Sequence, residues 1–313
     1  MLGYIGRRIL ATIPVMAVVG LFVFSLLYFA PGDPAAIIAG DQATPDDVAR
    51  IRATLGLDRP FLVRFWEWSW QILHGDLGTS IFTNLPVTTM IGQRVQPTVS
   101  LMLVTLVFAI VVAVPLGVVA AWKAGSLIDR LVMGLAVMGF SVPVFVVGYV
   151  LAYVFALELG WLPVQGYTPI EQGFWPWLSN LILPAVTLGL VYIALIARVT
   201  RATMLDVLQQ DYVRTARAKG LSQGPVLFIH ALKNAAVPII TVIGIGIALL
   251  IGGAVVTETV FAIPGLGRLT VDAILRRDYP VIQGVVLLFS FVYVLVNLAI
   301  DLSYTLLDPR IRY

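Results

Sequence analysis

Cysteine is absent from this chain of 313 residues, and histidine occurs only twice, at His74 and His230. Without cysteine the chain forms no disulfide, offers no thiolate nucleophile and holds no metal through cysteine. The two histidines lie far apart in the sequence, which argues against a histidine-rich metal site. Thiol catalysis and cysteine-ligated metals are therefore excluded.

Charge is also scarce. Charged residues make up 12% of the chain and hydrophobic residues 59%, whereas ordinary soluble domains contain about 25% and about 45–50%. The mean hydropathy is +0.96. A soluble fold has too little interior to bury so much apolar surface, so the composition indicates a protein whose solvent is lipid.

Six apolar segments are long enough to cross a bilayer, which requires about 20 residues in helical form. None contains a charged residue. Each is expected to be an α-helix, because lipid contains no water to pair with the backbone N–H and C=O groups. The first segment follows Arg7 and Arg8 but is longer than the apolar part of a cleaved signal, so we interpret it as an anchor. The segments are Ile9–Ala30, Val99–Trp122, Leu131–Leu157, Leu178–Ala197, Ala235–Val256 and Val281–Ile300.

Lysine and arginine predict the orientation, because they gather in the cytoplasmic loops of membrane proteins. With the N-terminus inside, the short inner loops carry most of them, and both termini are predicted to be cytoplasmic. The inner set is Arg7, Arg8, Lys123, Arg130, Arg198, Arg201, Arg214, Arg217, Lys219, Lys233, Arg310 and Arg312. The short outer loops hold Arg268, Arg276 and Arg277. The predicted organisation is helix 1 (1–30), a long outer loop (31–98), a transmembrane domain (94–307) with a cytoplasmic loop at 198–234, and a tail (308–313).

The outer loop 31–98 is predicted to contain two short helices. Thr44-Pro45-Asp46-Asp47 is a helix start, with Thr44 as cap, and the helix should run to about Leu55 and stop at Gly56. A second, amphipathic helix is expected over Phe61–Leu73, which contains Trp66, Trp68 and Trp70. Two interpretations of these tryptophans stay open: an aromatic belt at the membrane surface, or a platform that docks an external partner.

The cytoplasmic loop 198–234 is basic, and its sequence contains start and stop signals for two short helices. Asp211 is a candidate cap for a helix through Lys219, Gly220 a C-terminal stop, and Gly224-Pro225 the start of the next helix. An ordinary positively charged loop would explain the charges alone. Two capped helix ends that meet at one glycine favour a rigid helical knob that another protein binds.

Catalytic and energising motifs are missing. The chain has no Gly-x-x-x-x-Gly-Lys-Ser/Thr phosphate loop, so it does not hydrolyse ATP by that mechanism. The spans carry no acid, lysine or histidine of the kind that ion-coupled carriers use; Glu258 and Asp301, just beyond two spans, are interpreted as interfacial acids. A secondary carrier, a membrane-embedded enzyme and a passive channel are the alternatives to a permease driven by separate ATPases.

Motifs along the whole chain resemble one family, the binding-protein-dependent ABC importer permeases of the dipeptide, oligopeptide and nickel group. The matching segments include Tyr4-Ile5-Gly6-Arg7-Arg8, Pro31-Gly32-Asp33-Pro34, Leu55-Gly56-Leu57-Asp58, Gly75-Asp76-Leu77-Gly78, Asp211–Gly220, Ile263–Arg268, Arg277-Asp278-Tyr279-Pro280 and Asp308–Tyr313. The resemblance implies an all-α integral membrane protein of six transmembrane helices with the type I importer permease fold, in a bacterial or archaeal cytoplasmic (inner) membrane.

The resemblance also implies partners and a coupling site. A second, similar permease, two ATP-binding subunits and an extracytoplasmic binding protein would complete the importer, with ATP and Mg²⁺ bound by the ATPases and no cofactor or metal in this chain. The family's EAA-type motif aligns on Gly220, so that Arg214-Thr215-Ala216 stands where Glu-Ala-Ala is usual. The implied ATPase-coupling residues are Arg214, Thr215, Ala216, Arg217, Ala218, Lys219, Gly220 and Leu221. Short peptides are the implied solute, with nickel chelates, glutathione, opines or sugars as alternatives; nucleic acid is not an expected partner.

The segment between the last two spans contains a Pro-Gly-Leu-Gly stretch. It suggests a turn or a short re-entrant piece that acts as an outer gate, and an ordinary tight connection is an equal alternative. The candidate gate residues are Pro264, Gly265, Leu266, Gly267 and Arg268.

Overall fold

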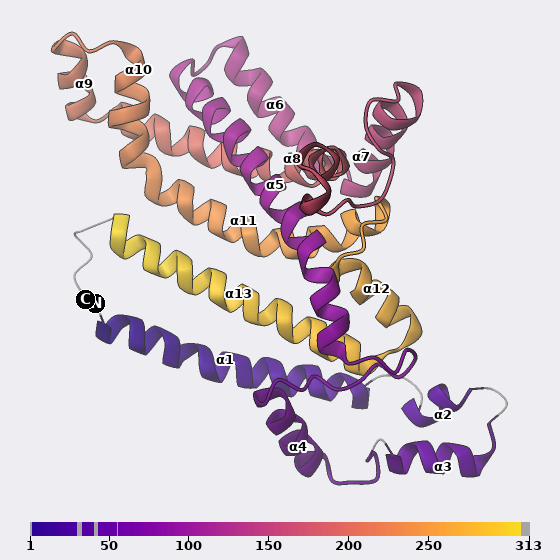
Figure 1. The fold of residues 1–313 in the computed structure, drawn as a ribbon. Helices are drawn as coiled ribbons and strands as arrows, with labels where there is room; N and C mark the ends of the chain where they lie inside the picture. Colours follow the sequence, from indigo (N-terminus) through magenta and orange to yellow (C-terminus); the bar gives the residue numbers. More distant parts are fainter. Residues whose placement is uncertain (1, 30–32, 41–42, 55, 308–313) are drawn as a thin grey trace. The chain divides into compact units, whose positions relative to one another are not determined.

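The computed structural model describes residues 2–29, 33–40, 43–54 and 56–307, and these ranges are built from helices and turns (Figure 1). The predicted helix end near Leu55, the start of the outer loop at 31 and the tail 308–313 lie outside them. The long helices are α1 (Leu2–Phe29), α5 (Val87–Trp122), α8 (Phe174–Leu208), α11 (Leu232–Val260) and α13 (Tyr279–Leu307). The shorter ones are α2 (Pro34–Ala39), α3 (Pro45–Thr54), α4 (Phe61–Leu73), α6 (Leu127–Ser141), α7 (Val144–Leu151), η1 (Ala152–Glu158), η2 (Ile170–Gln172), α9 (Asp211–Ala218), α10 (Gln223–Pro225), η3 (Val226–Ala231) and α12 (Leu266–Arg276).

Membrane-crossing helices are as many as predicted if one bent pair is counted as a single span. Among the described residues, five continuous helical segments are long and apolar enough to cross a bilayer, and the pair Leu127–Ser141 and Val144–Glu158 qualifies together. The continuous segments are Gly6–Leu27, Val87–Trp122, Phe174–Leu208, Gln223–Val260 and Tyr279–Leu302.

The third span departs from the prediction. We expected one continuous helix over Leu131–Leu157, but the chain bends by 104° between α6 and α7. Pro143 causes the break: it has no N–H to donate, and its ring drives the preceding residue out of the helical region. Val142 accordingly adopts φ −97° and ψ 127°, and Pro143 stands as the residue before α7.

The chain divides into two compact units. One comprises residues 1–94 and 269–294, and the other comprises 95–268 and 295–313. In the second unit α8 packs against α11 and α6 (Figure 1). Small residues permit close approach of backbones: a methyl group at Gly117 would lie 2.7 Å from the carbonyl oxygen of Ala197. Such small-residue contacts are typical of helix packing in lipid.

The first unit confirms the two helices predicted in the outer loop. α3 begins after Thr44, whose hydroxyl accepts a hydrogen bond from the Asp47 amide at 3.3 Å, while Asp47 Oδ2 accepts from the Thr44 amide at 3.2 Å. This reciprocal pair is a capping box, and the Thr44 side chain holds the pKa of Asp47 below its ordinary value. α4 has the predicted bounds, and Gly56 has the left-handed φ of +62° expected of a helix stop.

Candidate functional site

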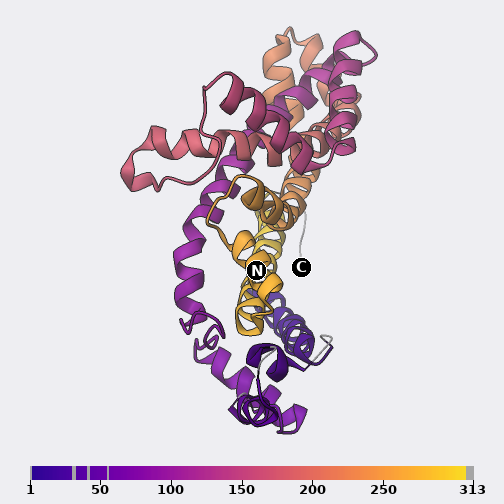
Figure 2. The ribbon, with the colours of Figure 1, turned by 90° about the vertical axis from the view of Figure 1, so that its right-hand side faces the viewer.

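The predicted knob is a compact helical hairpin, residues 208–226, which we call the coupling hairpin. It consists of α9, a turn and α10, and it lies at one end of the second unit (Figures 1 and 2). Val213 and Ala216 on the inner face of α9 are buried against Val226 and Leu208. The hairpin therefore has a small hydrophobic core of its own, which a slack loop would lack.

The turn of the hairpin depends on Gly220. Its φ is +81°, a left-handed conformation that glycine adopts without steric cost. The Leu221 amide donates to the Ala216 carbonyl at 3.3 Å and the Gly220 amide donates to the Arg217 carbonyl at 3.0 Å. These two bonds form a Schellman motif, so the predicted stop at Gly220 is confirmed.

The predicted cap at the other end of α9 is wrong. Gln210, not Asp211, precedes the helix in an extended conformation, and its side chain makes no capping hydrogen bond. Asp211 is the first helical residue, where its charge still complements the helix dipole. Its carboxylate instead accepts a hydrogen bond from Arg214 Nη1 at 3.3 Å.

The surface of the coupling hairpin carries the residues implied to contact an ATPase. All of Arg214, Thr215, Arg217, Ala218, Lys219, Gly220 and Leu221 are exposed, whereas Ala216 faces the hairpin core. Partial burial raises the pKa of the neighbouring Tyr212 above its ordinary value, and a hydrogen bond with the Asn234 side chain opposes this rise. The exposed face is thus basic and is presented by a folded support.

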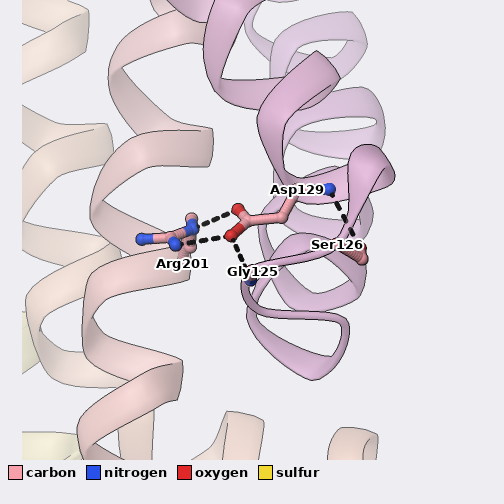
Figure 3. Close-up of polar contacts among 4 residues, drawn as sticks. All are labelled: Gly125, Ser126, Asp129 and Arg201. Atoms are coloured by element: carbon pink, nitrogen blue, oxygen red, sulfur yellow. Dashed lines mark hydrogen bonds and ion pairs between the residues drawn. The ribbon is translucent and has the colours of Figure 1, made fainter.

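An ion pair that the sequence did not single out braces the bundle near this hairpin. Nε and Nη2 of Arg201, on α8, donate to the two carboxylate oxygens of Asp129 at 2.5 and 2.7 Å (Figure 3). Asp129 stands in the first turn of α6, where its carboxylate also accepts from the Gly125 amide and its own amide donates to Ser126 Oγ. The Asp129 side chain is only 6% exposed. Because α8 leads directly into α9, the pair ties α6 to the helix that carries the hairpin.

The outer connection contains a buried acid, Glu258, at the outer end of the fifth predicted span. Glu258 lies in the last turn of α11 and is fully buried. Its Oε1 accepts a hydrogen bond from Thr98 Oγ at 2.6 Å, and its Oε2 accepts from the Arg268 amide at 3.0 Å. The Leu266 amide donates to Thr98 Oγ at 2.8 Å. We call Glu258 and Thr98, with the amides of Leu266 and Arg268, the outer anchor.

The outer anchor explains the Pro-Gly-Leu-Gly stretch. A methyl group at Gly265 would lie 2.3 Å from Glu258 Cδ, and one at Gly267 would lie 2.5 Å from Val255 Cα. Only glycine therefore lets the first turn of α12 close over the carboxylate, whose charge suits a helix N-terminus. Of the candidate gate residues, Gly265, Leu266 and Gly267 are buried, Arg268 is partly buried and Pro264 is exposed. The stretch is a packed helix start and not an open turn.

In the first unit, two of the motifs that carried the family resemblance come together. Asp278, from Arg277-Asp278-Tyr279-Pro280, is 4% exposed and accepts hydrogen bonds from Ser80 Oγ at 2.5 Å and from the Ile81 amide at 3.3 Å. A methyl at Gly78, from Gly75-Asp76-Leu77-Gly78, would touch Pro280 at 3.8 Å. These motifs therefore fasten the end of the outer loop to the start of α13.

The fold and the site together define a membrane-embedded transport subunit. It has membrane-crossing helices, an exposed basic hairpin on a folded support and a packed outer connection. Residues 113–313 match the family described as the binding-protein-dependent transport system inner membrane component, and residues 1–102 match the N-terminal part of such membrane components. The chain belongs to this family. It is a multi-pass permease subunit of the inner membrane and not itself the catalytic component of a transporter.

Relatives match over their whole length. The chain is 57% identical over 310 residues to a probable peptide ABC transporter permease of Sinorhizobium fredii, with 99% of each chain covered. It is 42% identical to a dipeptide transport system permease of Alkalihalophilus pseudofirmus and 43% identical to a glutathione transport system permease of Salmonella typhimurium, each covering 100% of both chains.

A solved structure supports the fold. The methionine ABC transporter MetNI, in an inward-facing form, matches with a TM-score of 0.59 at 18% identity, covering 70% of this chain and 96% of the matched chain. The expected type I importer permease fold is thereby confirmed.

Proposed function

We propose that this chain pairs with a second permease of the same family and imports short peptides, driven by two ATP-hydrolysing subunits on the coupling hairpin. The observation that carries the proposal is the hairpin itself, whose buried core and glycine turn hold a basic face outward. The names of the most similar relatives, which are peptide, dipeptide and glutathione permeases, support a short peptide as the solute.

Coupling follows from the rigidity of the hairpin. Closure of the ATPase dimer around ATP and Mg²⁺ displaces the hairpin, and α8 and η3–α11, which it connects, tilt with it. Arg214, Arg217 and Lys219 are the charges nearest the ATPase in this proposal. The permease supplies two conformations of similar free energy, and its partners shift the population between them.

The outer end has a matching role in the proposal. The binding protein delivers the solute to the outer loop, and the residues from Pro264 to Arg268 act as part of the outer gate. Because the outer anchor fastens this stretch to α11 and to Thr98, the stretch moves with these helices as one body and not as a loose flap.

Reconstitution tests the proposal. The chain, the partner permease and both ATPases are placed in liposomes, and uptake of labelled di- and tripeptides is measured with and without ATP and binding protein. We expect uptake only when all components are present. Uphill transport by this chain alone, or by an ion gradient without ATPases, would refute it. Mass spectrometry of the ligand on the cognate binding protein separates peptides from nickel chelates, opines and sugars.

A further inference from the structure

The amphipathic helix α4 has two apolar faces, and within the described ranges only one of them is packed. Phe61, Phe65 and Trp68 face α1, where their rings lie 5.3, 5.5 and 5.2 Å from the ring of Phe24. A second stripe is exposed to an unusual degree, with Leu62 at 74%, Trp66 at 69% and Leu73 at 79%. Trp70 belongs to this stripe at 56%. The spacing of these residues, three or four apart, places them on one side of the helix.

The polar residues of α4 form a third, narrow stripe. Arg64, Glu67 and Gln71 recur at the same helical spacing, and all three line one cavity of about 340 Å³ in the first unit. Glu67 pairs with Arg59 at 2.9 Å, which lies in the same cavity wall. The water-seeking side of α4 is thus separate from the exposed stripe of Leu62, Trp66, Trp70 and Leu73.

Contacts with α1 show how α4 lies. Residues spread over two turns of α4, from Phe61 to Trp68, all meet the single ring of Phe24. A helix parallel to α1 would spread these contacts over about 10 Å of α1, at 1.5 Å per residue. Helix α4 therefore runs across α1, as Figure 1 shows. Since α1 crosses the bilayer, α4 lies along the membrane surface.

One further contact shows where along α1 the helix α4 packs. A methyl at Gly20 would lie 3.8 Å from the Trp68 ring, and Gly20 is inside the apolar span Gly6–Leu27. Gly20 lies seven positions before Leu27, the last residue of that apolar segment, so the Trp68 ring packs on α1 about 10 Å before the segment ends. Helix α4 thus packs on the apolar part of α1, and a surface helix binds a bilayer by burying apolar side chains at the headgroup–acyl boundary.

We propose that the exposed stripe of α4, formed by Leu62, Trp66, Trp70 and Leu73, is inserted into the lipid leaflet beside the C-terminal end of α1. It is a membrane-surface anchor that holds the outer loop at a fixed distance from the bilayer. Trp68 is not part of it, because its ring is used for packing. The proposal concerns how the chain sits in the membrane and does not depend on which solute is carried.

Spin labelling tests the proposal, and the absence of native cysteine makes single sites in this chain straightforward. Trp66→Cys and Trp70→Cys are labelled with a nitroxide, with Gln71→Cys as the matched control from the polar stripe. The assembled transporter is placed in nanodiscs, and the accessibility of each label to oxygen and to a water-soluble nickel chelate is measured. We expect a several-fold higher ratio of oxygen to nickel accessibility at 66 and 70 than at 71, with or without binding protein.

Two outcomes would overturn the proposal. Free access of the nickel chelate at 66 and 70 would place the stripe in water. Protection from both reagents, or protection that appears only with the binding protein, would show that a protein covers it. If either tryptophan variant fails to assemble, Leu62→Cys and Leu73→Cys report on the same stripe.

Discussion

The outer anchor makes a sharp prediction about two neighbouring glycines. In Gly265→Ala, all the nearest atoms to the new methyl, at 2.3–2.4 Å, belong to the carboxylate of Glu258. In Gly267→Ala, the nearest atom is Val255 Cα at 2.5 Å, which is backbone. Because carbon atoms are stable at about 3.5–4.0 Å, Gly267→Ala has to move the first turn of α12 away from α11 by roughly 1 Å, and Gly265→Ala has to move either this turn or the Glu258 carboxylate by a similar distance.

Such a displacement has a calculable cost. Overpacking of a tight core costs about 1–3 kcal/mol. Losing the 3.0 Å bond from the Arg268 amide to Glu258 leaves a buried group unpaired, at about 1–3 kcal/mol. Each variant should therefore lose about 2–6 kcal/mol of stability. The control is Gly252→Ala on α11, where no described atom beyond the adjoining residues and the surrounding turn of its own helix lies within 4 Å of the new methyl.

A double-mutant cycle separates the two clashes. Glu258→Ala removes the carboxylate, so Gly265→Ala added to it should cost much less than in the parent chain. Gly267→Ala should lose only the part of its cost that comes from Glu258, whose Oε2 lies 2.9 Å from the new methyl, and should keep about 1–3 kcal/mol of overpacking against the Val255 backbone in both backgrounds. The assay is the temperature at which half of the detergent-solubilised transporter remains monodisperse, together with peptide uptake.

The result that refutes this reasoning is equally specific. If Gly265→Ala and Gly267→Ala both match Gly252→Ala in midpoint temperature and uptake, the glycines are not required for closure over Glu258. If Glu258→Ala relieves both variants to the same extent, the geometry assigned to Gly267 is wrong.

Three further predictions concern other parts of the second unit. Gly220→Val should lower the stability by about 1–2 kcal/mol, because valine is strained in the left-handed backbone conformation, and it should uncouple ATP hydrolysis from uptake. Gly224→Ala should do neither, and parallel ATPase and uptake assays check both variants. Asp129→Asn should lower the midpoint temperature by weakening the bond to Arg201, at about 1–3 kcal/mol, and an unchanged midpoint would count against the brace. Ala262→Gly should raise stability by up to about 1 kcal/mol, because Ala262 has φ +50°, and a lower midpoint would contradict it.

Local structure was largely predictable from the sequence, because its causes are local. The capping box at Thr44 and Asp47, the amphipathic repeat from Phe61 to Leu73 and the stop at Gly220 each depend on residues within a turn or two. The break at Pro143 also has a local cause, but the prediction of one continuous span followed the apolar run on both sides of the proline. Hydropathy alone cannot distinguish a continuous span from a bent one, whereas proline constrains the residue before it.

The anchoring contacts were not predictable in the same way, because their partners are distant in sequence. Glu258 and Thr98 are separated by 160 residues, and Asp129 and Arg201 by 72. A usable signal was nevertheless present for Glu258. An acid placed at the end of an apolar helix is costly to bury without donors, and the nearby glycines at 265 and 267 are the residues that let backbone amides approach closely. Taken together, an acid at a span end and a glycine pair at the next helix start predict that the amides of that helix bind the carboxylate.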